Sequence, residues 1–162
     1  LEPTDLLERL VPFLESTGVS SRPIRSEERD RLVQVIPLIQ ERLDTLGAAP
    51  ELIAFLFTTA AQIEIDPDLW TSESAQVLRM AGTILEKLPD WNADAIQGAL
   101  RESLVEGLSL KPKLAFGPVR TAICGRKISP PLFESMEILG KAESLLRIEN
   151  ATAQAVGGPL SE

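Results

Sequence analysis

The segment AFGPVRTAICGRKISPPLFESMEILGK, Ala115–Lys141, combines helical spacing of apolar residues with residues that start and stop helices. Its first half predicts a helix over residues 112–124, which Gly125 ends because glycine tolerates the left-handed backbone of a helix C-terminus. Its second half opens at Ser129-Pro130, a serine cap with proline in the first turn, and closes at Gly140. Two helices joined by a short turn are therefore predicted here.

Apolar residues recur at helical spacing before this segment as well, and no run alternates with the period of two that is typical of a strand. A first helix follows Thr4 and stops at Gly18. A second helix begins at a Ser26 cap, and Pro37 should kink or divide it because proline removes a backbone hydrogen bond. A third helix begins at Pro50, which suits a first helical position.

The remaining helices are predicted from their caps. Ser72 and Asn92 each precede an amphipathic stretch, and a last helix is expected over residues 142–150. About eight helices with short loops predict an all-α fold, a two-lobed bundle or cage. With the turn at Asp66-Pro67-Asp68 as the boundary, we expect one helical subdomain over residues 1–66, a second over 67–150 and a flexible tail over 151–162.

The composition excludes several kinds of chemistry. The 162 residues include no histidine, so no Ser-His-Asp or Cys-His nucleophile and no imidazole metal site can form. Cys124 is the single cysteine, which favours a cytoplasmic setting and, as a small apolar group, burial. No apolar run approaches the roughly 18 residues that span a membrane. The first residue is Leu1 rather than methionine, so we expect a piece of a longer protein without a signal peptide.

The charge is distributed unevenly along the chain. The net charge is -8, yet residues 110–147 carry seven lysine and arginine side chains against three carboxylates. A polyanion would therefore meet the last third of the chain. The alternative is that these cations form an ordinary solvated surface.

The segment Ala115–Lys141 resembles a block near the C-terminus of bacterial glutamyl-tRNA synthetases. The matching residues are Pro118, Val119, Arg120, Ala122, Ile123, Gly125, Pro130, Pro131, Leu132, Phe133, Glu134, Leu139, Gly140 and Lys141. Residues 42–46, RLDTL, resemble a second motif of that family, and residues 6–13 resemble the helix after its stem-contact fold. The resemblance thus extends over almost the whole chain.

This resemblance implies a recognition module rather than a complete enzyme. In that family a separate α/β domain activates glutamate with ATP and magnesium. Neither its HIGH-like nor its KMSKS-like signature motif occurs in this sequence. We therefore expect no cofactor and no catalysis in this fragment. The implied partners are the anticodon stem-loop of glutamate tRNA and the missing catalytic domain of the same chain, and we expect a monomer that does not bind membranes.

Arg42 is the first residue to which the resemblance assigns a role. An arginine at this position reads the third anticodon base, a cytosine in glutamate tRNA. The chemistry suits that role, because an unpaired cytosine presents two adjacent acceptors to paired donors. The alternative is a solvated arginine at a helix end, beside Glu41 and Asp44.

The resemblance also implies that Arg120 contacts the anticodon loop and that Leu132 packs against an unstacked base. Ser129 and Pro130 would expose backbone N–H groups at a helix start, which suits phosphate or base oxygens. The alternatives are an arginine stem packed on apolar neighbours and plain helix initiation.

Four further cations are candidates for phosphate contacts, which add affinity without sequence specificity: Lys111, Lys113, Arg126 and Lys127. Trp70 and Trp91 lie outside the basic region, and we expect them to anchor the core or a helix junction. The competing function is a helical protein-interaction scaffold without RNA binding. Net acidity and an aromatic content of 4% favour it, whereas the dense matches around Arg120 oppose it.

Overall fold

The computed structural model describes residues 2–40, 45–125 and 129–156, and within them the fold is helical without strands. Eight α-helices follow one another in the chain: α1 Pro3–Ser16, α2 Ser26–Ile39, α3 Ala49–Ile53, α4 Ser74–Glu86, α5 Ala93–Leu100, α6 Pro112–Cys124, α7 Leu132–Leu139 and α8 Lys141–Val156. Short 3-10 helices lie between them: η1 Leu46–Ala48, η2 Ala54–Phe57, η3 Ala60–Gln62 and η4 Pro67–Leu69. A wide π-type turn, η5 Arg101–Glu106, extends α5. The prediction of an all-α fold is confirmed.

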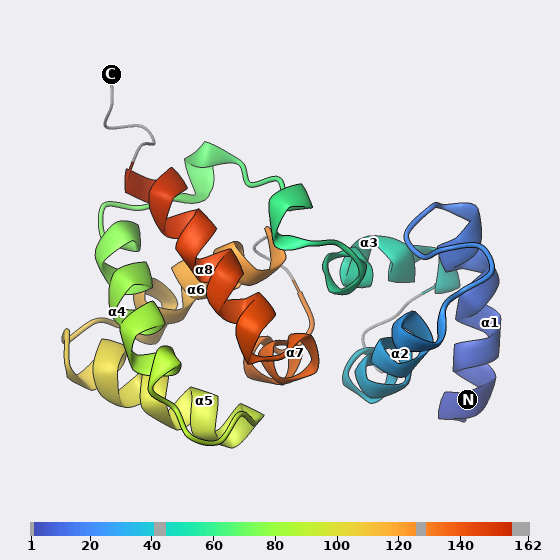
Figure 1. The fold of residues 1–162 in the computed structure, drawn as a ribbon, viewed down its shortest axis with the longest axis horizontal. Coiled ribbons are helices and arrows are strands. Elements are labelled where there is room, and N and C mark those ends of the chain that lie inside the picture. Colours follow the sequence, from blue (N-terminus) through green and yellow to red (C-terminus); the bar gives the residue numbers. More distant parts are fainter. Residues whose placement is uncertain (1, 41–44, 126–128, 157–162) are drawn as a thin grey trace.

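The helices form two groups, which Figure 1 shows side by side. The N-terminal group contains α1, α2 and α3, and the C-terminal group contains α4 to α8 (Figure 1). In the C-terminal group α4 lies along α8, and both pack against α6. Between the groups, α2 contacts α7, and η2 contacts α3 on one side and α6 and α7 on the other. The predicted subdomain boundary after residue 66 stays a prediction.

The first two helices form where the apolar pattern places them. Leu10 and Leu14 are fully buried in α1, and Gly18 follows the helix with a positive φ of 79°. Pro37 does not divide the second helix, because α2 continues to Ile39, and the expected kink stays a prediction. A proline so close to the C-terminus removes only one intrahelical bond, which the packing of α2 outweighs.

Two predicted caps are each displaced by one residue. The N-cap of α2 is Arg25 rather than Ser26, because the carboxylate of Glu28 accepts a hydrogen bond from the Arg25 backbone N–H at 3.0 Å. The N-cap of α4 is Glu73 rather than Ser72. The cap at Asn92 is confirmed, since its side chain accepts from the Ala95 N–H at 2.8 Å. Helix starts are thus correct to within a turn.

The last helix is longer than predicted. α8 runs to Val156 instead of ending at Asn150, so residues 151–156 are helical rather than part of a flexible tail. Ala151 is fully buried, and α4 packs along α8. This tertiary contact supplies stability that the tail's own composition does not predict. Residues 157–162 lie outside the described residues.

Three predictions about single core residues are confirmed. Trp70 is 8% exposed, and the Nε1 of Trp91 donates to the Met136 carbonyl at 2.9 Å, which ties the loop before α5 to α7. Cys124 is buried, and this burial raises the pKa of its thiol to about 11, although a hydrogen bond with Ser129 and the charge of Arg120 oppose the shift. The thiol is therefore neutral and unreactive at neutral pH.

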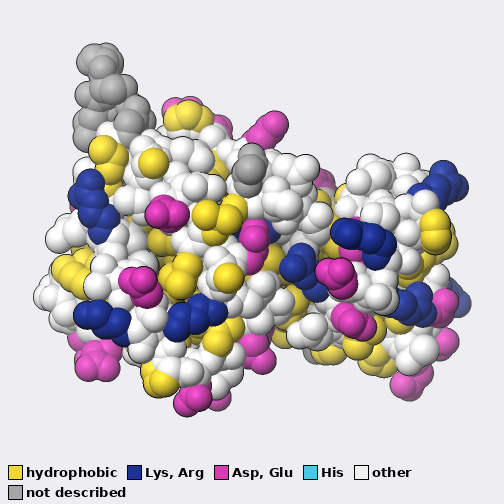
Figure 2. Space-filling model, viewed as in Figure 1, with side chains coloured by type: hydrophobic (Ala, Val, Ile, Leu, Met, Phe, Trp, Pro, Cys, Tyr) yellow, Lys and Arg dark blue, Asp and Glu magenta, His cyan; other side chains and the backbone are white. Residues whose placement is uncertain are grey.

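Figure 2 shows one face of the molecule, on which basic and acidic side chains are interspersed. Apolar side chains gather over α4 and α8 on this face (Figure 2), where Leu146 and Val156 are 46% and 48% exposed. The face drawn in Figure 2 thus has no large patch of one charge sign.

Candidate nucleic-acid interface

Helix α6 presents one face that carries both cations and an aromatic side chain. Pro112 is its first residue, where the missing proline N–H leaves no backbone bond unmade. Spacings of three and four residues place Lys113, Phe116 and Arg120 on the same side of the helix. Gly125 ends α6 with φ at 76°, as predicted, and donates its N–H to the Thr121 carbonyl at 2.7 Å.

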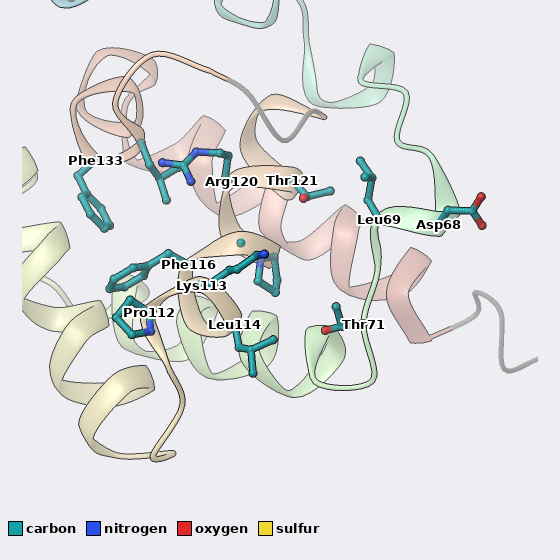
Figure 3. Close-up of a pocket in the computed structure, with 13 residues that line it drawn as sticks. Asp68, Leu69, Thr71, Pro112, Lys113, Leu114, Phe116, Arg120, Thr121 and Phe133 are labelled. Carbon is teal, nitrogen blue, oxygen red and sulfur yellow. The ribbon is translucent and has the colours of Figure 1, made fainter.

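Arg120 is held in place by the turn before α7. Its Nε donates to the Ser129 Oγ at 3.3 Å, and that hydroxyl donates to the Pro130 carbonyl at 2.7 Å. Ser129 is 7% exposed, whereas Arg120 is half-buried. In Figure 3 the guanidinium extends from α6 toward the helix that carries Phe133. Its terminal nitrogens are thus brought to the wall of a groove.

The structure corrects the prediction that Ser129 caps this helix. α7 begins at Leu132 and its N-cap is Pro131, so Ser129 and Pro130 precede the helix. Both residues are buried, and the Ser129 hydroxyl bonds Arg120 and the Pro130 carbonyl instead of the first N–H groups of α7. Two successive prolines impose the extended backbone that delays the helix.

A groove of about 620 Å³ lies between α6, the first turn of α7 and the segment from Asp68 to Thr71 (Figure 3). We call it the α6–α7 groove. Its wall includes Pro118, Leu132 and the rings of Phe116 and Phe133. The two rings meet edge to face, with centroids 5.3 Å apart and planes at 87°. The groove is large enough to hold a nucleotide base, and its apolar lining suits the flat face of one.

Charged groups stand at the rim of this groove. Lys113 and Arg120 contribute positive charge from α6, whereas the carboxylate of Asp68 points away from the groove in Figure 3. The groove therefore offers donors for phosphate or base acceptors. An unpaired nucleotide presents such acceptors.

The basic region of the sequence is less positive at the surface than its residue count indicates. Arg147 is 2% exposed and forms an ion pair with Glu143 at 2.8 Å. The Nζ of Lys141 donates to the Leu88 carbonyl at 2.9 Å. These two cations are bonded within the fold, so the positive surface charge next to the groove comes from Lys111, Lys113 and Arg120 among the described residues.

The structure brings some of the predicted RNA-binding residues together. Arg120, Lys113 and Leu132 line one groove, and Ser129 bonds Arg120 directly behind it. Leu132 is 2% exposed, so it forms part of the groove floor and not an open platform. Lys111, the N-cap of α6, is exposed and lies outside the lining. Pro130 is buried. Three further predicted residues lie outside the described residues: Arg42, Arg126 and Lys127.

Sequence reasoning missed several residues of this region. Phe116 had a detectable signal, because it lies four residues before Arg120 and shares its helix face. Phe133 and Asp68 reach the groove from other parts of the chain, so no local spacing indicates them. Arg147 contacts carbonyls 24 to 92 residues away, and its role is visible only in three dimensions.

The sequence matches the family described as Anticodon binding domain over residues 5–152. The chain belongs to this family. A glutamate–tRNA ligase of Kocuria rhizophila is 45% identical over 157 residues, which cover 95% of this chain and 31% of the ligase. A glutamate–tRNA ligase of Acidothermus cellulolyticus is 46% identical over 158 residues, again 95% of this chain and 31% of the ligase. The family predicted from the sequence is thus confirmed, and the chain spans about a third of the length of these relatives.

Solved structures agree on the fold of this anticodon binding domain. The crystal structure of a glutamate tRNA ligase from Elizabethkingia meningosepticum has a TM-score of 0.78 at 19% identity and covers 96% of this chain and 30% of that chain. A glutamate–tRNA synthetase from Elizabethkingia anophelis has a TM-score of 0.72 at 18% identity. Across the part of the chain that the structure describes, no helix is long and apolar enough to cross a membrane.

Proposed function

We propose that this anticodon binding domain recognises the anticodon stem-loop of glutamate tRNA within a glutamate–tRNA ligase. The observation that carries the proposal is the arrangement at the α6–α7 groove. There Arg120, bonded to Ser129 at 3.3 Å, stands beside an apolar space lined by Phe116 and Phe133. An unstacked base needs an apolar surface for its face and fixed donors for its edge, and the groove has both.

In this proposal the contacts divide into two kinds. Arg120 donates to a base or phosphate at the groove, and Leu132 contributes to the floor against which a base packs. Lys111 and Lys113 add affinity by attracting phosphates, as Arg126 and Lys127 are expected to do. Arg42 reads the third anticodon base, as the family resemblance implies. Phosphate contacts position the loop, whereas base contacts select it.

The proposal also assigns a place to this chain within a larger enzyme. The ligase joins glutamate to tRNA with ATP and magnesium bound in a separate catalytic domain, and the anticodon binding domain holds the tRNA for it. The isolated 162-residue chain is proposed to act as a cytoplasmic monomer without catalytic activity or a cofactor.

Fluorescence anisotropy with a labelled glutamate-tRNA anticodon stem-loop tests this function at low salt. We expect saturable binding by the wild-type chain and a roughly tenfold or greater loss of affinity for Arg120→Ala, because a good arginine–base contact contributes about 1–3 kcal/mol. The matched control is Arg101→Ala, which removes an exposed arginine outside the groove. This control should bind like wild type.

A second stem-loop with guanine at the third anticodon position tests the selection of the base. Weaker binding of this stem-loop, together with the loss for Arg120→Ala, would support recognition of glutamate tRNA. Equal losses for Arg120→Ala and Arg101→Ala would indicate unspecific charge attraction and contradict the groove as the binding site. If neither stem-loop binds at millimolar RNA, the protein-interaction scaffold becomes the better hypothesis.

A further inference from the structure

Thr121 is a buried threonine of α6 whose side chain lines the α6–α7 groove (Figure 3). It is 4% exposed, and its hydroxyl has no hydrogen-bond partner in the part of the chain that the structure describes. Every side-chain oxygen or nitrogen of the described residues that is sealed from solvent does have such a partner. The Thr121 hydroxyl is therefore not sealed, and it is reached through the groove.

Two other helical threonines bond their hydroxyl within their own helix. Thr83 on α4 and Thr152 on α8 each donate to the carbonyl four residues earlier, at 3.0 and 2.7 Å. Thr121 makes no such bond among the described residues, although it also lies within a helix. A buried hydroxyl without a hydrogen bond lowers stability, so one in a native fold requires an explanation. A ligand in the groove supplies the missing bond.

The groove leaves a path to this hydroxyl. Gly117 lies one turn before Thr121 on α6 and also lines the groove. Apart from its two chain neighbours, no side chain lies within 4 Å of the position that a Cβ on Gly117 would take. The other hydroxyl in the lining, that of Thr71, is already paired with the Ser74 hydroxyl at 3.2 Å. Of these two hydroxyls, the one on Thr121 is thus left for a ligand.

The surroundings of the hydroxyl favour the edge of a base over a phosphate. Pro118 and Leu132 are buried apolar residues of the same lining, and apolar walls exclude the water that a charged phosphate needs. A base edge is neutral and carries donors and acceptors, and a hydroxyl can serve as either. We infer that Thr121 is a specificity-determining residue: its hydroxyl bonds the edge of the unstacked base that the groove holds. This inference rests on the proposed function.

Thr121 and Arg120 then contact one base from two directions. Consecutive residues of an α-helix point about 100° apart, and both side chains line the groove. Arg120 can only donate, so it selects an acceptor, whereas Thr121 can pair with a donor or an acceptor. A base that offers Arg120 an acceptor but has no group opposite Thr121 leaves the buried hydroxyl unpaired and binds more weakly.

The binding test uses Thr121→Val, which replaces the hydroxyl with a methyl group and keeps the branched shape. We expect about fivefold weaker binding of the glutamate-tRNA anticodon stem-loop, the loss typical of one neutral hydrogen bond. Thr152→Val is the matched control, because it makes the same change in a helix outside the groove. It should bind like wild type. Equal binding by Thr121→Val and wild type would overturn the inference.

A conservative variant separates the hydroxyl from the shape of the side chain. Thr121→Ser keeps the hydroxyl and loses only the methyl group, so its affinity should stay within about twofold of wild type. If Thr121→Ser bound as weakly as Thr121→Val, packing and not the hydroxyl would decide affinity, and the inference would be wrong.

Stem-loops that each lack one base of the loop identify the group that the hydroxyl contacts. For one of them, wild type and Thr121→Val should bind equally, because the base that pairs with the hydroxyl is gone. The fivefold difference should persist for the others. A difference that persists for every stem-loop of the series would place the contact on the sugar–phosphate backbone and overturn the assignment to a base edge.

Urea denaturation tests the free hydroxyl without RNA. Thr121→Val should not lower the midpoint of unfolding, because no hydrogen bond within the protein is lost. A clearly lower midpoint would mean that the fold itself uses the hydroxyl, and it would overturn the inference.

The outcomes separate this inference from the proposed function. If wild type binds the stem-loop and Thr121→Val binds it equally well, the function stands and the role of Thr121 is refuted. If wild type shows no saturable binding, the function is refuted and the inference with it. Weaker binding by Thr121→Val that disappears for one stem-loop of the series supports both.

Discussion

Replacement of Arg147 by methionine should strongly destabilise the chain. The substitution removes hydrogen bonds to three backbone carbonyls, at 2.6, 2.8 and 2.8 Å. These carbonyls belong to segments that the side chain of Arg147 holds together from α8. Methionine fills most of the space but has no donor, so the carbonyl oxygens lose their partner while the side chain stays buried.

The expected loss follows from these contacts. A buried acceptor without its partner costs roughly 1–3 kcal/mol, and breaking a buried charge pair typically costs about 3–5 kcal/mol. Burial also opposes the charged form, because it lowers the pKa of Arg147 despite the hydrogen bond and charge of Glu143. Methionine is uncharged, so the substitution also removes the cost of burying a charge, and this offsets part of the lost stability. We therefore expect the free energy of unfolding to fall by about 4 kcal/mol.

Urea denaturation at pH 7 and 25 °C, followed by circular dichroism, measures this loss. A chain of this size should also show a melting temperature lower by about 8–16 °C. The control is Arg79→Met, which makes the same change at an exposed arginine of α4; its cost should be within about 0.5 kcal/mol. A loss below about 1 kcal/mol for Arg147→Met would refute the reasoning, because it would mean that water or other donors replace the guanidinium.

Two further predictions concern pH and backbone conformation. Burial raises the pKa of Glu28, but hydrogen bonds from the backbone and from Arg25 outweigh it and lower the pKa below 4.5. Its stabilising effect is therefore present above pH 4.5 and is lost as the pH falls through the folded-state pKa. Glu28→Gln should cost about 1 kcal/mol at pH 7 in urea titrations and progressively less as the pH falls below 4.5, and a cost independent of pH would contradict this. Gly125→Ala should lower the free energy of unfolding by about 2 kcal/mol, because φ is 76° and the new Cβ would lie 3.0 Å from the Glu64 carbonyl oxygen. The matched change Gly98→Ala, in a helix with open space around it, should stabilise the chain by about 0.5–1 kcal/mol, and equal effects of the two glycine changes would be inconsistent with a strained backbone at residue 125.

The helices could be predicted largely because their signals are local. Apolar spacing of three and four residues predicted α1 and α4, and Gly125 and Gly140 marked two helix ends correctly. Errors occurred where distant contacts decided the outcome. α8 extends to Val156 because α4 packs along it, and this contact leaves no trace in the composition of residues 151–156.

The candidate site could be predicted only in part. The family resemblance and the charge of the last third pointed to Arg120, Lys113 and Leu132, and all three line the same groove. The role expected for Ser129 was different, because the hydroxyl was expected to cap a helix and instead holds Arg120. Which atoms a polar side chain bonds depends on the fold around it, not on its neighbours in sequence.

The sequence by itself determined that this chain is an all-helical member of the anticodon binding domain family, and it placed most helices to within a turn. Helical period, caps and family motifs are properties of consecutive residues, so one dimension is enough to read them. Only the tertiary structure decided that Phe116 and Phe133 meet in a groove and that Arg147 joins η2 to α6. These contacts connect residues up to 92 positions apart, and their energies arise from burial and hydrogen-bond geometry that exist only after the chain has folded.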